Sequence, residues 1–267
     1  MKKFLAFWAI SLSLAVAVVV SANAATPPVF IEDLTWVELR DRVAGGAVIA
    51  LVPTGATEAS GPHLALGKHS FVIRDLAGRI AIALGNALVA PVIPIVPEGS
   101  MDKPAGNFDY PGTLGLSEGT FANVLRETVA GLARSGFKTI AFLGDHGQSQ
   151  PVQTLVAEEL DAQWRARGVR VFNVASFYDP AGQDRWLEQN GVAPAALGDH
   201  AGVADTAQLM ASRPGAVRRD RLSQDTWTEK SPSGATGRPD RATPEMGMAL
   251  LQQRVDAAVA EIRRHVR

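Results

Sequence analysis

Four histidines lie in glycine-flanked loops or at the ends of predicted elements, positions that suit side chains that do chemistry. They are His63, His69, His146 and His200, whereas His265 stands two residues from the end of the chain. The chain contains no cysteine, which excludes disulfides and thiolate ligands. Any metal ion must therefore be bound through nitrogen and oxygen atoms.

The first candidate cluster combines a carboxylate with an imidazole. Glu58 follows an apolar run at residues 47–53, and Gly55 turns the chain between them. The glycine- and proline-rich loop that comes next can bring His69 back beside Glu58. His146 directly follows a second apolar run. Carboxylate oxygens and imidazole nitrogens suit zinc, manganese or iron. Spacing alone indicates a candidate metal site and no more, since no His-x-x-x-His pattern is present.

A third cluster surrounds His200, with Asp205 five residues later. Asp145 and Asp199 each directly precede a histidine of these clusters. Such carboxylates can orient the ring of a metal-binding histidine. They can equally cap helices, and the sequence leaves both interpretations open.

Strands and helices alternate along the chain. The predicted strands are apolar runs at 47–53, 87–96, 138–143 and 169–175, and the predicted helices are 35–43, 70–84, 117–135, 150–167, 200–211 and a last one that begins at 244. Runs without polar alternation are typical of parallel strands buried on both faces. Pro91 and Pro94 predict an edge position, or an early end, for the second strand. We expect an α/β fold whose sites lie beyond the carboxyl ends of the strands.

The N-terminus has the pattern of a secretory signal peptide. Lys2 and Lys3 precede an apolar run at residues 4–20, and Ala22-Asn23-Ala24 offers a cleavage site after residue 24. An uncleaved membrane anchor is the alternative, because the run is about long enough to cross a bilayer. Cleavage at residue 24 would leave 243 of the 267 residues, which we expect to form one domain, 25–267. The protein is thus predicted to be exported, periplasmic or secreted.

Charge gives little support to polyanionic partners. The formal net charge is −1, and loss of the two N-terminal lysines would make it −3. No dense stripe of lysine and arginine is present, so we predict no nucleic-acid partner. After cleavage no further apolar run is long enough to span a membrane. A small molecule is the expected partner.

Several segments resemble the signatures of the creatininase family, in family order, from about residue 47 to residue 250. PTGATEASGPHLALGKH is similar to P-x-G-S-x-E-Q-H-G-P-H-L-P-L-G-T-D, and FDYPGTL to F-x-F-P-G-T-I. LGDHGQSQ is similar to N-G-H-G-G-N, and DHAGVADTAQLM to H-A-G-x-x-E-T-S. The late G-D-P-x-x-A-T-x-E-x-G has its counterpart at residues 237–247. The resemblance implies a three-layer α/β/α sandwich around a mainly parallel sheet, often assembled as a homo-oligomer, including hexamers.

The resemblance also implies a metal site. Family members usually hold two divalent ions, and the positions that bind the first are Glu58, His69 and His146 here. The second ion would use Ser60 and Gln148 and share His69, which stands where the family has an aspartate. An imidazole has one lone pair and cannot bridge two cations as a carboxylate can. Because Ser60 and Gln148 are weak neutral ligands, we expect one divalent ion per subunit, zinc first, with manganese or iron as alternatives.

By the same resemblance, His200 matches the family's acid/base, with Asp205 or Asp199 assisting and Asp145 a weaker candidate. His63 has no place in the family's metal scheme, and we interpret it as structural. Tyr110, Gln148 and Trp186 are the candidate substrate contacts. The predicted activity is hydrolysis of an amide or cyclic amide C–N bond by metal-activated water. A non-catalytic protein that binds a small molecule or a metal, and a hydrolase of another bond such as a lactone, remain alternatives.

Overall fold

The computed structural model describes residues 28–100, 102–103, 105–222 and 234–266. Its strands are β1 (Ile49–Thr54), β2 (Ala87–Val89), β3 (Thr139–Gly144) and β4 (Arg170–Asn173). Its α-helices are α1 (Trp36–Ala44), α2 (Lys68–Leu84), α3 (Glu118–Arg134), α4 (Gln150–Trp164), α5 (Pro180–Gln189), α6 (Val203–Ser212) and α7 (Pro244–His265). The predicted signal peptide lies outside the described residues and stays a prediction.

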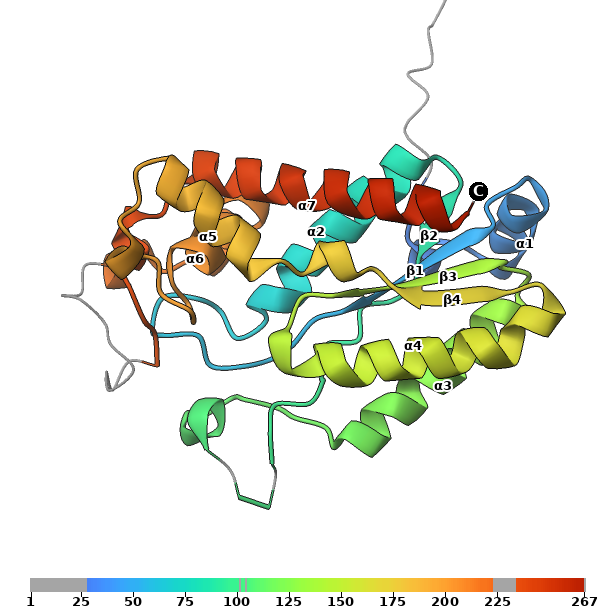
Figure 1. The fold of residues 1–267 in the computed structure, drawn as a ribbon, viewed down its shortest axis with the longest axis horizontal. Coiled ribbons are helices and arrows are strands. Elements are labelled where there is room, and N and C mark those ends of the chain that lie inside the picture. The colour runs from blue at the N-terminus through green and yellow to red at the C-terminus, as the bar shows by residue number, and fades with distance from the viewer. Residues whose placement is uncertain (1–27, 101, 104, 223–233, 267) are drawn as a thin grey trace, which may run out of the picture.

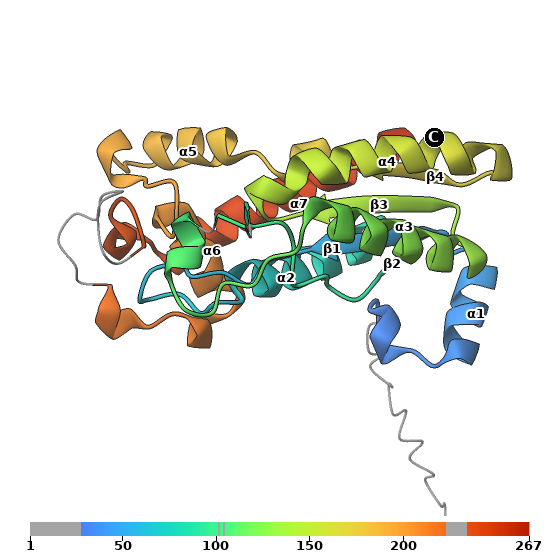
Figure 2. The same cartoon turned by 90° about the horizontal axis from the view of Figure 1, so that it is seen from below.

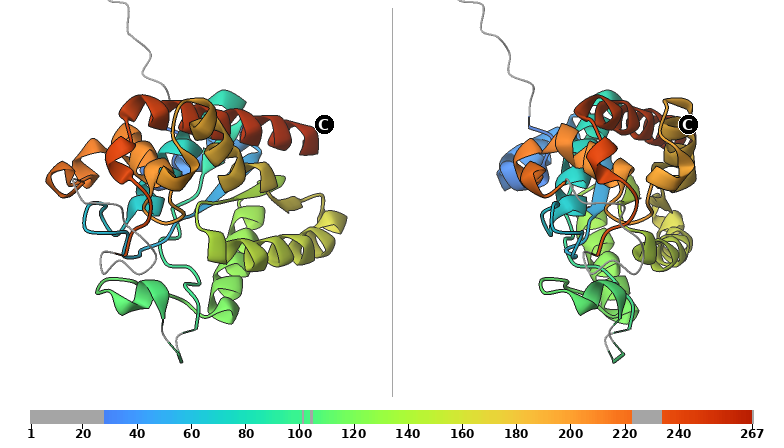
Figure 3. Two further views of the ribbon diagram at one scale, coloured as in Figure 1. Left: turned by 60° about the vertical axis from the view of Figure 1, so that its left-hand side comes forward. Right: turned by 90° about the vertical axis from the view of Figure 1, so that its left-hand side faces the viewer.

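The four strands form one parallel sheet in the order β2-β1-β3-β4. Alternate residues of β1 enter different cores: Ile49 and Leu51 pack with α2, α6 and α7, whereas Ala50 and Val52 pack with α3 and α4. Helices therefore cover both faces of the sheet, with α2, α6 and α7 on one side and α3 and α4 on the other (Figure 1). The predicted three-layer α/β/α sandwich is confirmed, and Figure 3 shows its layers from two further directions.

Two elements differ from the sequence-based expectation. The strand predicted over 87–96 ends at Val89, because Pro91 and Pro94 have no N–H to continue the ladder. It lies at the edge of the sheet, as predicted. Helix α5 was not predicted, since Leu187 is its one fully buried residue and its apolar spacing is weak. The local signal was Asp179, which caps the helix, followed by proline in the first turn.

Loops that follow the strands gather at one end of the molecule together with α5 and α6 (Figure 2). Thr54 at the end of β1 lies in register with Gly144 at the end of β3, so the chain leaves both strands side by side. Glu58 and His146 come shortly after these points. The fold thus places both side chains at the expected edge of the sheet. No helix within the described residues is long and apolar enough to cross a membrane.

Candidate metal centre and its cavity

Glu58, His69 and His146 converge on one point, as predicted. Each offers one ligand atom, these atoms lie within 4.8 Å of one another, and all three residues are buried. Glu58 Oε1 lies 2.9 Å from His69 Nε2, and Glu58 Oε2 lies 3.3 Å from His146 Nε2. One carboxylate and two imidazoles at this spacing match the donor set of a zinc, manganese or iron site.

The start of α2 can reach Glu58 because of Gly55. A Cβ atom at this position would lie 2.5 Å from Ser70 Oγ and 2.8 Å from Ser70 Cα. Any larger residue would therefore push away the first turn of α2, which carries His69. Gly55, directly after β1, permits the close approach of strand and helix on which the site depends.

The ring of His69 is oriented by a buried ion pair. His69 Nδ1 lies 2.9 Å from Asp145 Oδ2, and Arg254 of α7 holds the other oxygen of Asp145. In the neutral ring the proton stays on Nδ1, and the Nε2 lone pair then faces Glu58, as in carboxylate–histidine–metal triads. Burial and the Lys68 charge lower the pKa of His69, but the bonds to Asp145 and Glu58 outweigh both and raise it to about 9. Of the two interpretations left open for Asp145, the geometry favours ring orientation.

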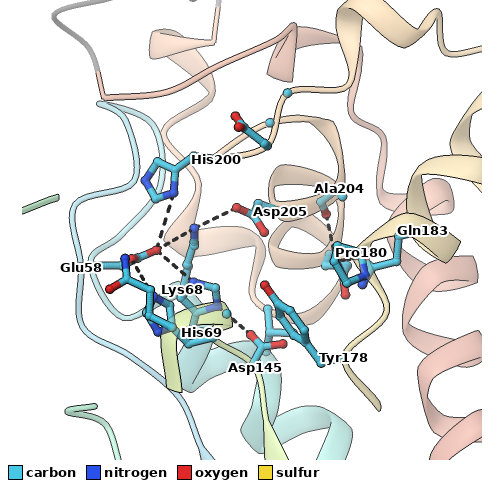
Figure 4. A pocket seen from close by; sticks show the side chains of 18 of the residues that line it. Glu58, Lys68, His69, Asp145, Tyr178, Pro180, Gln183, His200, Ala204 and Asp205 are labelled. Atoms are coloured by element: carbon cyan, nitrogen blue, oxygen red, sulfur yellow. Dashed lines mark hydrogen bonds and ion pairs between the residues drawn. The ribbon is translucent and has the colours of Figure 1, made fainter. Parts of the chain in front are cut away.

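Lys68 brings a cation into the site that the sequence analysis missed. Its side chain is buried, and Nζ lies 3.0 Å from Glu58 Oε1 and 2.8 Å from Asp205 Oδ2 (Figure 4). Burial would raise the pKa of Glu58, but Lys68 and the imidazoles outweigh it and hold this pKa far below its usual range. Lys68 likewise holds the pKa of Asp205 below its usual range against the effect of burial. Both carboxylates are therefore ionised at neutral pH.

His200 lies beside the same carboxylate, in the loop that precedes α6. Its Nε2 is 2.9 Å from the carbonyl oxygen of Ala59, so Nε2 carries the proton and Nδ1 has a free lone pair. Nδ1 lies 3.9 Å from Glu58 Oε1. Burial and the Lys68 charge lower the pKa of His200, which keeps the ring neutral at pH 7.

Asp205 fixes the shape of this loop. Its Oδ2 accepts from the backbone N–H of Ala201, whose φ is 52°, in the left-handed region that costs an alanine about 1–2 kcal/mol. Strained backbone of this kind persists only where the surroundings impose it, and it often accompanies functional sites. Asp199 holds the other side of the loop, because its Oδ1 accepts a 2.6 Å bond from Thr236.

A cavity of about 370 Å³ opens onto this cluster, which is large enough for a small molecule. Gln148, one of the three predicted substrate contacts, lines it together with Asn107, Tyr178 and Gln183. The other two predicted contacts do not line it. Trp186 packs against the hydrophobic core, and the ring of Tyr110 lies against Gly234.

The residues missed by the sequence analysis left weak local signals. Lys68 stands in the first turn of α2, where the helix dipole disfavours a cation, so a lysine at this position needs a nearby anion. Glu98 follows an apolar segment much as Glu58 does, and it is buried beside His146, with Glu98 Oε2 3.3 Å from His146 Nε2. Asn107 donates a 2.6 Å bond to Glu58 Oε2 from a loop that no sequence pattern tied to the site.

His63 lies apart from the residues that line the cavity. It is fully buried, with Nε2 2.9 Å from Thr206 Oγ1. Burial, together with the Lys68 charge, lowers the pKa of His63 to about 4. The structural interpretation of His63 agrees with this placement.

This pKa predicts a loss of stability in acid. Between pH 6.5 and pH 4 the unfolded chain binds a proton that the folded His63 refuses, so the free energy of unfolding falls as the pH is lowered through this window. Between pH 6.5 and pH 4.5, we expect the free energy of unfolding of His63→Gln to fall by roughly 1–2 kcal/mol less than that of the unmodified protein. Chemical denaturation in the presence of a chelator measures both slopes, and equal slopes would contradict the prediction.

Comparisons with known proteins place this chain in a family. The model of the creatininase family, described as creatinine amidohydrolase, matches residues 32–262. Creatinine amidohydrolase of Pseudomonas putida is 28% identical over 202 residues, which cover 73% of this chain and 75% of that protein. The 3-dehydro-scyllo-inosose hydrolase of Thermotoga maritima is 26% identical over 120 residues, which cover 45% of this chain and 36% of that protein.

Solved structures show the same fold. A manganese creatininase has a TM-score of 0.73 at 23% identity and covers 89% of this chain and 98% of its own. A Zn-Zn form of a creatininase variant has a TM-score of 0.74 at 24% identity and covers 90% of this chain and 99% of its own. The family match spans most of the chain, so this α/β protein is a member of the creatininase family.

Proposed function

We propose that the protein is a metal-dependent amidohydrolase that hydrolyses a C–N bond of a small molecule. The observation that carries this proposal is the convergence of Glu58, His69 and His146 beside a cavity. Membership of the creatininase family supports it, as does the relative named creatinine amidohydrolase. A divalent ion held by these three residues would polarise a substrate carbonyl and lower the pKa of water.

We further propose that each subunit holds one ion, zinc first, with manganese or iron as alternatives. The Zn-Zn and manganese forms of related creatininases support the choice of metal. Ser60 and Gln148, at the positions expected to bind a second ion, offer a neutral hydroxyl and a neutral amide. The Lys68 ammonium, 3.0 Å from Glu58 Oε1, adds a fixed positive charge that repels a second cation.

His200 is the proposed proton carrier. Its ring is held by Ala59, it is neutral at pH 7, and its Nδ1 has a free lone pair. His200 can thus accept a proton from water and deliver it to the leaving nitrogen. The low pKa of Asp205 makes it a poor proton acceptor. Its proposed role is therefore to hold Lys68 and the backbone N–H of Ala201 in place.

The substrate is proposed to be small and polar. The cavity combines ionic groups with the neutral amides of Asn107, Gln148 and Gln183, which can bind carbonyl and N–H groups of a cyclic amide. The two relatives carry the names of different substrates, creatinine and an inosose. The proposal of a C–N bond therefore depends on the amide side chains of the cavity and on the relative named creatinine amidohydrolase. Export after removal of residues 1–24 and assembly as a homo-oligomer belong to the same proposal and rest on the sequence.

The proposal is tested by assay and metal counting. We expect purified protein to hydrolyse at least one member of a panel of cyclic amides and formamides, and to lose that activity reversibly when a chelator removes the metal. Elemental analysis should find one tightly bound divalent ion per chain. Two tightly bound ions would contradict the one-ion proposal. Tight binding of a panel compound without turnover would instead favour a non-catalytic binding protein.

A further inference from the structure

Glu98 is a buried carboxylate that the three-ligand scheme does not use. It lies in the segment that follows β2, is 3% exposed, and its side chain is fully enclosed. Within the described residues, neither of its carboxylate oxygens has a hydrogen-bond partner. An ionised carboxylate in such surroundings is unfavourable unless a cation lies beside it. The fold therefore places a carboxyl group where its ionised form needs a nearby positive charge.

The position of Glu98 relative to His146 indicates what that cation is. Glu98 Oε2 and Glu58 Oε2 each lie 3.3 Å from the same atom, His146 Nε2. One N–H cannot point at both oxygens, and hydrogen bonds of this type are usually about 2.7–3.2 Å long. Ligand atoms around a tetrahedral ion with bonds of about 2.0–2.1 Å are separated by roughly 3.3–3.4 Å. The 3.3 Å spacing of Glu98 and His146 is thus that of two ligands of one ion, and Glu98 borders the group of Glu58, His69 and His146, whose ligand atoms all lie within 4.8 Å of one another.

The charges around the site lead to the same conclusion. The site contains four carboxylates, those of Glu58, Glu98, Asp145 and Asp205. Lys68 pairs with Glu58 and Asp205, Arg254 pairs with Asp145, and Glu98 lies beside His146. When His69 and His146 are neutral, as histidines must be to bind a metal, and all four carboxylates are ionised, this group carries two uncompensated negative charges. One divalent ion would neutralise it, and among the described residues Glu98 is the carboxylate of the four that contacts neither lysine nor arginine.

We propose that Glu98 is a fourth ligand of the ion bound by Glu58, His69 and His146, an inference that rests on the metal site of the proposed function. Four protein ligands leave substrate or water to join as a fifth, which zinc accepts during catalysis. Glu98 would then set both the affinity and the coordination number of the ion.

Glu98→Gln tests this inference, because it removes the charge and keeps the shape. We expect its dissociation constant for Zn²⁺, measured by competition with a chelator, to rise more than about 100-fold, since even outer partners of ligands are worth 10–100-fold. Glu127→Gln, an exposed carboxylate on α3, should bind as tightly as the unmodified protein. Glu98→Asp should retain part of the affinity.

Thermal unfolding supplies a second measurement. Added Zn²⁺ should raise the melting temperature of Glu98→Gln less than that of the unmodified protein, because the variant binds the ion more weakly. Unchanged Zn²⁺ affinity in Glu98→Gln, or a rise in melting temperature with Zn²⁺ equal to that of the unmodified protein, would overturn the inference and make Glu98 a structural partner of His146. If the unmodified protein itself bound no divalent ion, the proposed function would fail as well.

Discussion

His146→Ala is expected to release the divalent ion and to abolish turnover at metal concentrations that saturate the unmodified protein. His146 Nε2 lies 3.3 Å from both Glu58 Oε2 and Glu98 Oε2, so its removal deprives the ion of a central ligand. The two carboxylates then face each other without the imidazole between them. We expect metal affinity to fall more than about 100-fold, beyond the 10–100-fold effect of changing an outer partner.

Metal content after gel filtration and chelator competition measure this effect. His265→Ala is a matched control. The His265 imidazole, at the end of α7, stacks on Phe172 and touches no residue of the site. Circular dichroism should show that His146→Ala keeps its fold. A folded His146→Ala protein that retains one ion per chain and normal turnover would remove His146 from the site.

His200→Ala is expected to keep the ion and lose most of the turnover. General acid–base catalysis typically contributes 10²–10⁴-fold, so kcat should fall by about that factor. Metal content should stay at the level of the unmodified protein, because Nδ1 of His200 lies 3.9 Å from Glu58 Oε1 and the ring is bonded to Ala59. His146→Ala is expected to lose both the ion and turnover, so comparison of the two variants separates metal binding from proton transfer.

The pH profile gives a second readout for His200. Burial and the Lys68 charge lower the pKa of His200, so the neutral ring persists below pH 6.5 and activity is lost only as the pH falls through that lowered pKa. This acid limb should disappear in His200→Ala, and added imidazole should restore part of the rate. Full activity in the variant, or an unchanged acid limb, would show that His200 carries no proton.

The sheet could be predicted from sequence because its signals are local. In β1 and β3 every residue is buried, and a continuous apolar run of this length indicates a parallel strand. The caps of α3 and α7, Ser117 and Thr243, are equally local, as each accepts from the backbone three residues later. Helix α5 was missed because few of its residues are buried, so tertiary packing rather than periodicity decides its conformation.

The candidate site was predictable in part for a similar reason. Glu58 and His146 follow apolar strands, and residues just after parallel strands meet at one edge of the sheet. The roles of Lys68, Glu98 and Arg254 depend on contacts between distant parts of the chain. Lys68 meets Asp205 across 137 positions and Arg254 meets Asp145 across 109, and no local pattern reports such pairings.

The most direct measurement is an anomalous-difference map from crystals grown with Zn²⁺ and recorded at the zinc absorption edge. We expect one peak per chain, about 2.0–2.2 Å from a Glu58 oxygen, His69 Nε2 and His146 Nε2. A map without a peak at these three side chains, or with zinc bound only elsewhere, would contradict the account of this protein as a metal-dependent hydrolase.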